Sequence, residues 1–264
     1  MNKKILGTLT LLMLLPSFSY AQNDDFGLDL GVGAEKKLVK GVSLDAELGV
    51  RTQDNTQKVE RLSAGLGLGV KLYSSASKKF DLKASAGWEY IWQNKLGSTE
   101  NKFDDGGNSK GYNVTKHYWQ PRHRTTLGLG ASYKPNKRWS FSLKESVRYN
   151  HYNAVDSVNF KYRFNDDDEA YLKSVSSKDA RDRFELRSKA EAQYDIRNSH
   201  FAPFVSVDYG CGLNYTGHKW KFSGGTDYKL SKTDKLTIYY RFQTENDDDE
   251  PNGHIIGLGY NHKF

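Results

Sequence analysis

Cysteine is almost absent from this sequence, since Cys211 is the only one among 264 residues. An intramolecular disulfide is therefore excluded, and stability must come from backbone hydrogen bonds and burial. Proline and methionine are scarce, with 5 and 2 residues, and no apolar run is long enough to cross a membrane as a helix. Glycine, tyrosine and phenylalanine are abundant instead, with 24, 17 and 13 residues. This composition favours a β-protein over a helical one.

The first residues, MNKKILGTLTLLMLLPSFSYAQ, have the pattern of an export signal. Lys3 and Lys4 precede an apolar stretch at 5–18, and a small-x-small site ends at Ala21. We therefore predict a signal peptide at 1–21 that is cleaved. No cysteine lies near the cut, which excludes a lipoprotein. Removing the two lysines changes the formal net charge from +7 to +7 − 2 = +5, and export argues against a nucleic-acid partner.

The remaining chain, 22–264, alternates apolar and polar residues with a period of two. VSLDAELGVR, RLSAGLGLGVKL and FDLKASAGWEYIW show this most clearly. Period two is typical of strands with one apolar and one polar face, so the pattern predicts an all-β chain. The predicted strands are 26–36, 42–51, 61–72, 80–92, 118–133, 139–152, 181–195, 201–213, 219–230, 236–245 and 253–264.

These segments are long, and the connections between them alternate in length. Short turns such as SSASKK, KPNKR and SKTDK contrast with long connections at 93–117 and 153–180. Long strands joined alternately by short turns and long loops are typical of an antiparallel outer-membrane β-barrel, whose apolar face meets lipid and whose polar face lines the lumen. The alternative is a soluble sandwich, which has shorter strands and turns of mixed length.

Aromatic residues gather at both predicted membrane interfaces. Trp88, Tyr90 and Trp92 lie toward a long loop, whereas Phe80, Trp139, Phe201 and Tyr228 lie beside short turns. The last strand ends in a phenylalanine, as bacterial outer-membrane barrels characteristically do. By that resemblance, Tyr260, His262 and Phe264 form the membrane-insertion signal that the barrel-assembly machinery recognises.

The number of strands is the open point of this prediction. Eleven segments alternate, yet bacterial single-chain barrels have even strand numbers. Residues 22–25 span only about 13 Å, too short to cross the membrane before the first strand. We therefore favour ten strands, or twelve if one is missed, within a range of 10–12.

The predicted lumen face carries charge in zones, acidic early and basic late in the chain. The candidate lumen-lining residues are Arg122, Arg124, Lys144, Arg148, Arg183, Glu185, Arg187, Arg241, Asp45, Glu47 and Glu89. They line either a narrow, anion-preferring, porin-like passage or a plug of ion pairs, and a lumen of about ten strands favours the plug. Gly65, Gly67 and Gly69 leave space on this face. Glu145 falls on the lipid-facing side, and we expect a bulge to turn it inward.

No catalytic site or cofactor is predicted. His123 and His151 lie near the rim, but neither has a serine at a diagnostic spacing. An outer-membrane lipid-modifying enzyme that uses one of these histidines is the alternative. A third interpretation is a surface adhesin that acts through loops 93–117 and 153–180.

The acidic motif NDDDE occurs twice, at 165–169 and 246–250, in connections assigned to the outside. Consecutive acids do not match the spacing of a calcium-binding EF-hand loop. We expect solvated, mutually repelling tips, with weak Ca²⁺ binding as the alternative.

Four stretches resemble a known family: FGLDLGVGAEKKL near the mature start, YWQPRHR (118–124), GGTDYKL (224–230) and NDDDEPNGHIIGLGYNHKF (246–264). Together they are similar to an uncharacterised family of Bacteroidetes outer-membrane proteins, domain of unknown function 2490. The resemblance implies a barrel in the cell outer membrane, in contact with its lipids and lipopolysaccharide. It implies no activity and no catalytic residue.

Overall fold

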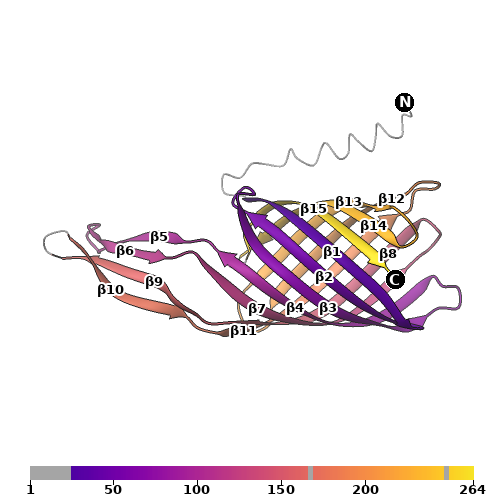
Figure 1. Ribbon diagram of the computed structural model, residues 1–264, viewed down its shortest axis with the longest axis horizontal. Coiled ribbons are helices and arrows are strands. Elements are labelled where there is room, and N and C mark those ends of the chain that lie inside the picture. The colour runs from indigo at the N-terminus through magenta and orange to yellow at the C-terminus, as the bar shows by residue number, and fades with distance from the viewer. Residues whose placement is uncertain (1–24, 166–168, 247–249) are drawn as a thin grey trace, which may run out of the picture.

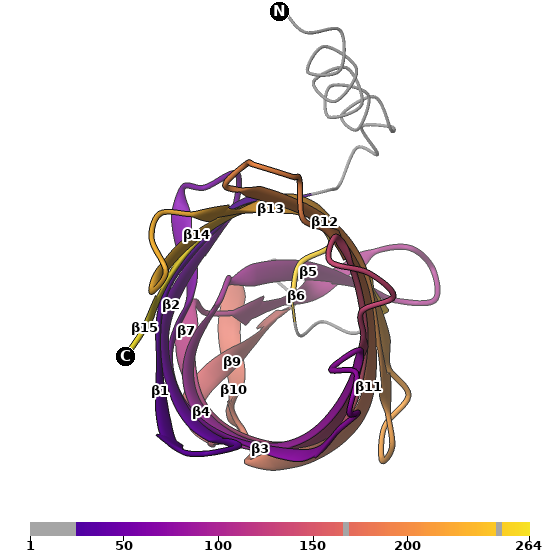
Figure 2. The same ribbon diagram turned by 90° about the vertical axis from the view of Figure 1, so that its right-hand side faces the viewer.

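The computed structural model describes residues 25–165, 169–246 and 250–264, and the predicted signal peptide at 1–21 lies outside them. Eleven strands form a closed barrel in the order β1-β15-β14-β13-β12-β11-β8-β7-β4-β3-β2. Figure 1 shows this barrel from the side and Figure 2 along its length. The barrel strands are β1 (Asp25–Val39), β2 (Val42–Gln53), β3 (Lys58–Ser74), β4 (Phe80–Lys95), β7 (Tyr118–Tyr133), β8 (Trp139–Tyr152), β11 (Arg181–Tyr194), β12 (Phe201–Gly212), β13 (His218–Lys229), β14 (Asp234–Glu245) and β15 (Gly253–Lys263).

The barrel prediction is confirmed, and a soluble sandwich is excluded. Each of the eleven alternating segments overlaps one barrel strand. The barrel strands are between 11 residues (β15) and 17 residues (β3) long. A strand that crosses a membrane needs about 9 to 11 residues. Within the described residues there is no helix that is long and apolar enough to span a membrane.

The barrel closes through a parallel pair, which explains why the strand count is odd. β1 pairs with β15 in parallel, from Asp25 opposite Gly253 to Glu35 opposite Lys263. The other ten neighbouring pairs are antiparallel. Eleven lies within the predicted range of 10–12, but the preference for an even number was wrong. It assumed antiparallel closure, whereas β1 and β15 run in the same direction, side by side in Figure 1.

Alternation along the strands sorts side chains between the outside and the lumen. Outward positions expose large apolar side chains, among them Leu48, Leu127 and Val205, which are 63%, 62% and 63% exposed. A water-facing surface rarely exposes so many, because burying apolar area is favourable. This outer band is instead suited to hydrocarbon, in which a closed barrel leaves no unpaired strand edge.

Both predicted aromatic belts are present. Near the long connections, Trp88 and Tyr90 pack on His123 with ring centroids 5.9 and 5.1 Å apart. At the short-turn end, the centroid distance between Phe201 and Tyr228 is 4.8 Å. Amphipathic rings of this kind suit the headgroup level of a membrane.

The expected bulge at Glu145 is wrong. β8 pairs with β7 and with β11 without a shift in register, so Glu145 stays on the outer face. There Ser188, its neighbour across the β8–β11 pair, donates a hydrogen bond to the Glu145 carboxylate over 2.5 Å. This local hydrogen bond offsets part of the cost of a carboxylate in the apolar band.

We predict that Glu145→Leu stabilises the barrel in lipid vesicles. Removing a lipid-facing carboxylate should raise the free energy of unfolding by on the order of 1–2 kcal/mol. Ser188→Ala is the matched variant and should lower it, because Glu145 then loses its donor. Urea titration of both proteins measures the effect, and a less stable Glu145→Leu protein would refute the outward placement.

The two long connections are not loops, which corrects the prediction for 93–117 and 153–180. They form a second sheet of β5 (Ser98–Phe103), β6 (Ser109–Thr115), β9 (Val155–Phe164) and β10 (Ala170–Lys178), in the order β10-β9-β6-β5. Figure 1 shows this sheet projecting from one end of the barrel, which we call the sheet end. The opposite end carries the short turns, and we call it the short-turn end.

Candidate functional site

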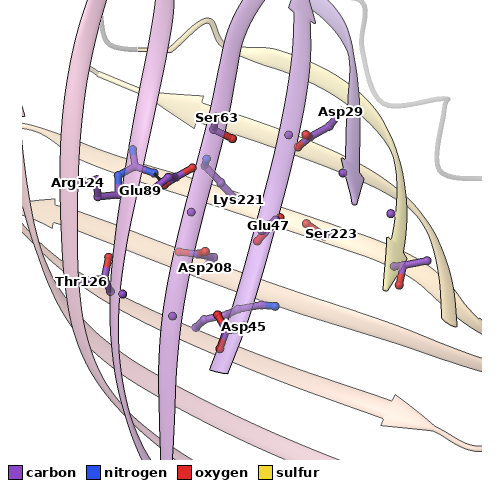
Figure 3. A pocket seen from close by; sticks show the side chains of 18 of the residues that line it. Asp29, Asp45, Glu47, Ser63, Glu89, Arg124, Thr126, Asp208, Lys221 and Ser223 are labelled. Atoms are coloured by element: carbon purple, nitrogen blue, oxygen red, sulfur yellow. Dashed lines mark hydrogen bonds and ion pairs between the residues drawn. The ribbon is translucent and has the colours of Figure 1, made fainter. Parts of the chain in front are cut away.

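The lumen contains a polar cavity of about 720 Å³. Its walls are the inward-facing residues of the barrel strands, including the predicted Gly65 and Gly67. It reaches the short-turn end at Asp227 and Lys235, where the Lys235 side chain is 41% exposed. Figure 3 shows Asp45, Glu47, Glu89 and Arg124 among the side chains that surround this space. The lumen is therefore partly hollow.

At the sheet end the lumen is closed around one carboxylate, that of Glu250. This residue lies in the connection between β14 and β15, and it is only 6% exposed. Its oxygens lie 3.2 Å from the guanidinium of Arg51, 3.3 Å from that of Arg61, and 3.5 and 3.0 Å from the amines of Lys219 and Lys221. These cations come from the neighbouring strands β2 and β3 and from β13, so Glu250 joins β13 to a strand pair that does not adjoin it in the barrel.

Arg51 is the second centre of this closure. It is 2% exposed, and its guanidinium also lies 2.7 Å from Asp29 and 3.7 Å from Glu60. Arg241 adds a further contact to Asp29 at 3.3 Å. Burying an unpaired charge strongly lowers the stability of a protein, so the buried cations here require a similar number of carboxylate partners. We call the group of Arg51, Asp29, Glu60, Arg61, Lys219, Lys221 and Glu250 the mouth cluster.

The rest of the mouth is filled by polar side chains from β7 and β8. Arg122 is 1% exposed and donates a hydrogen bond to the Tyr152 hydroxyl over 2.6 Å. Arg124 donates to Asn150 over 2.9 Å and to Glu89 over 3.0 Å. Together with the mouth cluster, these side chains fill most of the lumen toward the sheet end, where only a small cavity of about 20 Å³ remains.

The expectation of solvated acidic tips is wrong for Glu250 and holds for Glu169. Glu169, the last residue of the first NDDDE motif, is exposed, whereas Glu250, at the same position of the second motif, is buried in the mouth. The three aspartates of each motif, 166–168 and 247–249, lie outside the described residues. Among the residues that the structure describes, no group of three or more histidine, cysteine or acidic side chains is arranged to hold a metal ion. Weak Ca²⁺ binding at the acidic connections stays a prediction.

The predicted lumen-lining residues fall into two groups. One group is paired: besides Arg122, Arg124, Glu89 and Arg241, Arg187 binds Asp208 and lies 3.7 Å from Glu185, and Arg183 stacks on Tyr215 at 4.4 Å. The other group comprises Asp45, Glu47, Lys144 and Arg148. In the part of the chain that the structure describes, these four form no ion pair or hydrogen bond, yet all four line the cavity. The lumen thus combines both predicted arrangements, a plug at the mouth and an open space with free charges behind it.

Sequence reasoning missed most of the mouth cluster. Arg51 continues the lumen-facing series of Asp45 and Glu47, and Lys219 and Lys221 alternate in the same way on β13. The alternation of the sequence is therefore a signal that could have placed all three in the lumen. Glu250 had no such signal, because it lies outside the strands. Its contact with Arg51 spans 199 positions in the sequence.

The pH dependence of the closure follows from Glu250. Burial alone would raise the pKa of its carboxyl, but Lys219, Lys221, Arg61 and Arg51 outweigh burial and hold this pKa well below its ordinary value. A group with a lowered pKa contributes stability above its unfolded pKa, about 4.3 for glutamate, and loses it as the pH falls toward the folded pKa.

We therefore predict that the mouth stays closed between pH 7 and pH 5. Conductance in planar bilayers should be the same at both values. An increase at pH 5 would contradict a Glu250 that stays ionised.

The rim histidines bind carboxylates on the outer face. Asp182 lies 2.7 Å from Nδ1 of His151 and accepts a hydrogen bond from the Tyr149 hydroxyl over 2.8 Å. The same YNH sequence recurs at 260–262, where Asp234 lies 2.7 Å from His262 and 2.6 Å from the Tyr260 hydroxyl. Because the arrangement occurs at both ends of the barrel, it is suited to anchoring strands at the interfaces. The absence of a catalytic site and the insertion signal at Tyr260, His262 and Phe264 remain predictions.

The closed barrel, its apolar outer band and its polar lumen define an outer-membrane β-barrel protein. Residues 39–144, less than half of the chain, match the model of the Autotransporter beta-domain family. The resemblance to the Bacteroidetes family of unknown function stays a prediction.

Two solved structures match this chain over most of its length. The beta domain of the Bordetella autotransporter Brka is 13% identical, with 85% of this chain and 82% of that chain covered and a TM-score of 0.45. The monoaromatic hydrocarbon channel CymD is 11% identical, with coverages of 85% and 84% and a TM-score of 0.29. No curated protein matches this chain.

Proposed function

We propose that the protein is a narrow, normally closed passage for small charged solutes across the outer membrane. The observation that supports this most is the cavity of about 720 Å³, which is lined by unpaired charges behind a closed mouth. Ion pairs would fill the lumen of a purely structural barrel, as side chains fill small barrels. Here Asp45, Glu47, Lys144 and Arg148 line the cavity without an ion pair or hydrogen bond among the described residues, so they are available to contact a solute.

The orientation follows from the connections. Outer-membrane barrels have short periplasmic turns and longer extracellular connections. The short-turn end would then face the periplasm and the mouth cluster the outside. Glu250 would act as the latch, because among the residues that the structure describes it is the one that joins β13 to β2 and β3 across the lumen. Among the described residues, release of Glu250 would leave Arg61 and Lys221 without a carboxylate partner, whereas Arg51 would keep Asp29 and Glu60, and Lys219 would keep Glu245.

Recording the purified protein in planar bilayers tests the proposal. We expect rare, discrete current steps in the native protein, because the mouth is closed most of the time. If neither the native protein nor a variant without the Glu250 carboxylate conducts above background, the passage is refuted and a structural barrel remains.

A second candidate function, surface binding, rests on the projecting sheet. One face of it is aromatic: the rings of Tyr112 and Tyr162 stack at 4.9 Å, and Phe164 packs edge-on against Tyr112 at 6.3 Å. These three rings are half-buried, and aromatic residues are enriched in protein–protein interfaces. Replacing 98–115 and 155–178 by short turns should then abolish attachment of cells to a surface while conductance is retained. Unchanged attachment would reject this role.

A further inference from the structure

The four unpaired charges of the lumen lie on two separate strands. Asp45 and Glu47 are on β2, and Lys144 and Arg148 are on β8. Around the barrel, β3, β4 and β7 lie between these two strands. One wall of the cavity therefore carries two acids and the other two bases, and among the described residues none of the four forms an ion pair or a hydrogen bond, although opposite charges such as Arg61, Glu185 and Asp208 lie near them.

The strand register fills the space between the two walls with small side chains. Starting from Asp45, successive partners across the sheet are Gly67, Gly87, Thr126 and then Arg148. An added Cβ at Gly67 would collide with the Asp45 carboxylate, so the glycine makes room for it. The result is a shallow trough in the barrel wall with an acid at one end and a base at the other.

The adjacent row of the sheet has the same character. From β2 to β8 it reads Ser43, Gly69, Ser85, Gly128 and Ser146. These two rows of small residues form the wall beneath the charged side chains, and the Lys144 side chain lies over Gly128. On the far side, Glu89 and Arg124 pair with each other at 3.0 Å and so do not compete for it.

The length of the trough limits the size of a ligand. Four inter-strand steps of about 4.8 Å make roughly 19 Å of wall between β2 and β8. The side chains of Asp45 and Arg148 reach inward from both ends and leave a gap on the order of 10 Å. An extended peptide of about three residues has this length.

We propose that this trough binds a small zwitterion, such as a short peptide with free ends. Its carboxylate would lie on Arg148 and Lys144, because a guanidinium pairs with a carboxylate through two parallel hydrogen bonds. Its ammonium group would lie on Asp45 and Glu47. A simple anion is repelled by the acidic wall and a simple cation by the basic wall, so both ends of the trough select a dipolar solute. This inference builds on the proposed function by naming its solute class.

Calorimetric titration of the detergent-solubilised barrel tests the proposal with three probes. Triglycine carries both charges, N-acetyl-triglycine lacks the ammonium group, and triglycine amide lacks the carboxylate. We expect triglycine to bind at least about tenfold more tightly than either blocked form, since each loses a charged contact worth about 1.4 kcal/mol or more. Equal binding of all three probes, or no binding of triglycine, would overturn the zwitterion site.

Two variants assign the ends of the ligand. Arg148→Gln should make triglycine and its amide bind alike, and Asp45→Asn should do the same for triglycine and its N-acetyl form. Lys263→Gln is the control, because Lys263 pairs with Glu35 outside the cavity lining, and it should leave all three affinities unchanged. If Asp45→Asn equalised triglycine and its amide instead, the assigned orientation of the peptide would be wrong.

The titration does not depend on passage. Binding without current in bilayers would support the site and refute the proposed function. Current without selective binding of triglycine would support the proposed passage and refute the zwitterion site.

Discussion

Replacing Glu250 by alanine is expected to open the barrel. The change leaves four cations, Arg51, Arg61, Lys219 and Lys221, without the carboxylate that joins them. Removing one partner of a buried ion pair costs about 3–5 kcal/mol. Since about 1.4 kcal/mol is a factor of ten, the fraction of time spent open should rise by about a hundredfold or more. Single-channel recording measures it directly.

The sequence provides a matched control for this experiment. Glu169 ends the same NDDDE motif in the connection between β9 and β10, where it is exposed. Glu169→Ala removes the same charge from the same local sequence and should leave the current unchanged. The open state of Glu250→Ala should also prefer anions, because the cations of the mouth remain. Equal conductance in both variants would mean that Glu250 is not the latch.

Replacing Arg51 by methionine should cause a large decrease in the free energy of unfolding. Three carboxylates, Asp29, Glu60 and Glu250, contact this guanidinium. Glu60 is 1% exposed, and Arg51 is its only ion-pair partner in the described part of the chain. An unbalanced buried carboxylate of this kind should lower the free energy of unfolding by about 3–5 kcal/mol. Urea titration in lipid vesicles measures the loss.

Two further variants show whether the loss of stability is specific to Arg51 or follows from removing any arginine. Arg138→Met removes an exposed arginine whose side chain, within the described residues, donates only to the Tyr194 hydroxyl, over 3.1 Å, and should change stability by less than about 1 kcal/mol. The double variant Arg51→Met with Glu60→Met should recover part of the loss, because no unpaired carboxylate remains at position 60. If Arg51→Met and Arg138→Met were equally stable, the mouth cluster would have no structural role.

Periodicity predicted the barrel because lipid and lumen impose opposite demands on alternate residues. Leu48 and Glu47 are adjacent in the sequence, yet one is exposed on the apolar outer band and the other lines the cavity. Period two carries this contrast without any knowledge of the fold. The same periodicity also occurs in Phe160, Tyr162 and Phe164 of β9, which lie in the segment predicted to be a loop.

Features that depend on distant pairing were not predictable in this way. The parallel pairing of β1 with β15 joins the two ends of the chain, and nothing within either strand encodes its direction. Glu250 lies outside the alternating strands, so periodicity does not place it. Its contacts with cations of β2, β3 and β13 follow only from the folded barrel. Glu145 departed from the pattern, and its neighbour Ser188 explains how it stays outside without a bulge.

Cysteine labelling tests the lumen and its closure most directly. Because Cys211 is the only cysteine, Cys211→Ser gives a background in which Glu47→Cys and Leu48→Cys can be compared. A water-soluble reagent that does not cross membranes should label Glu47→Cys only when the periplasmic side is opened, and should label Leu48→Cys from neither side. Equal labelling of the two neighbours would contradict the division between lumen and lipid, and labelling of Glu47→Cys in intact cells would contradict the closed mouth.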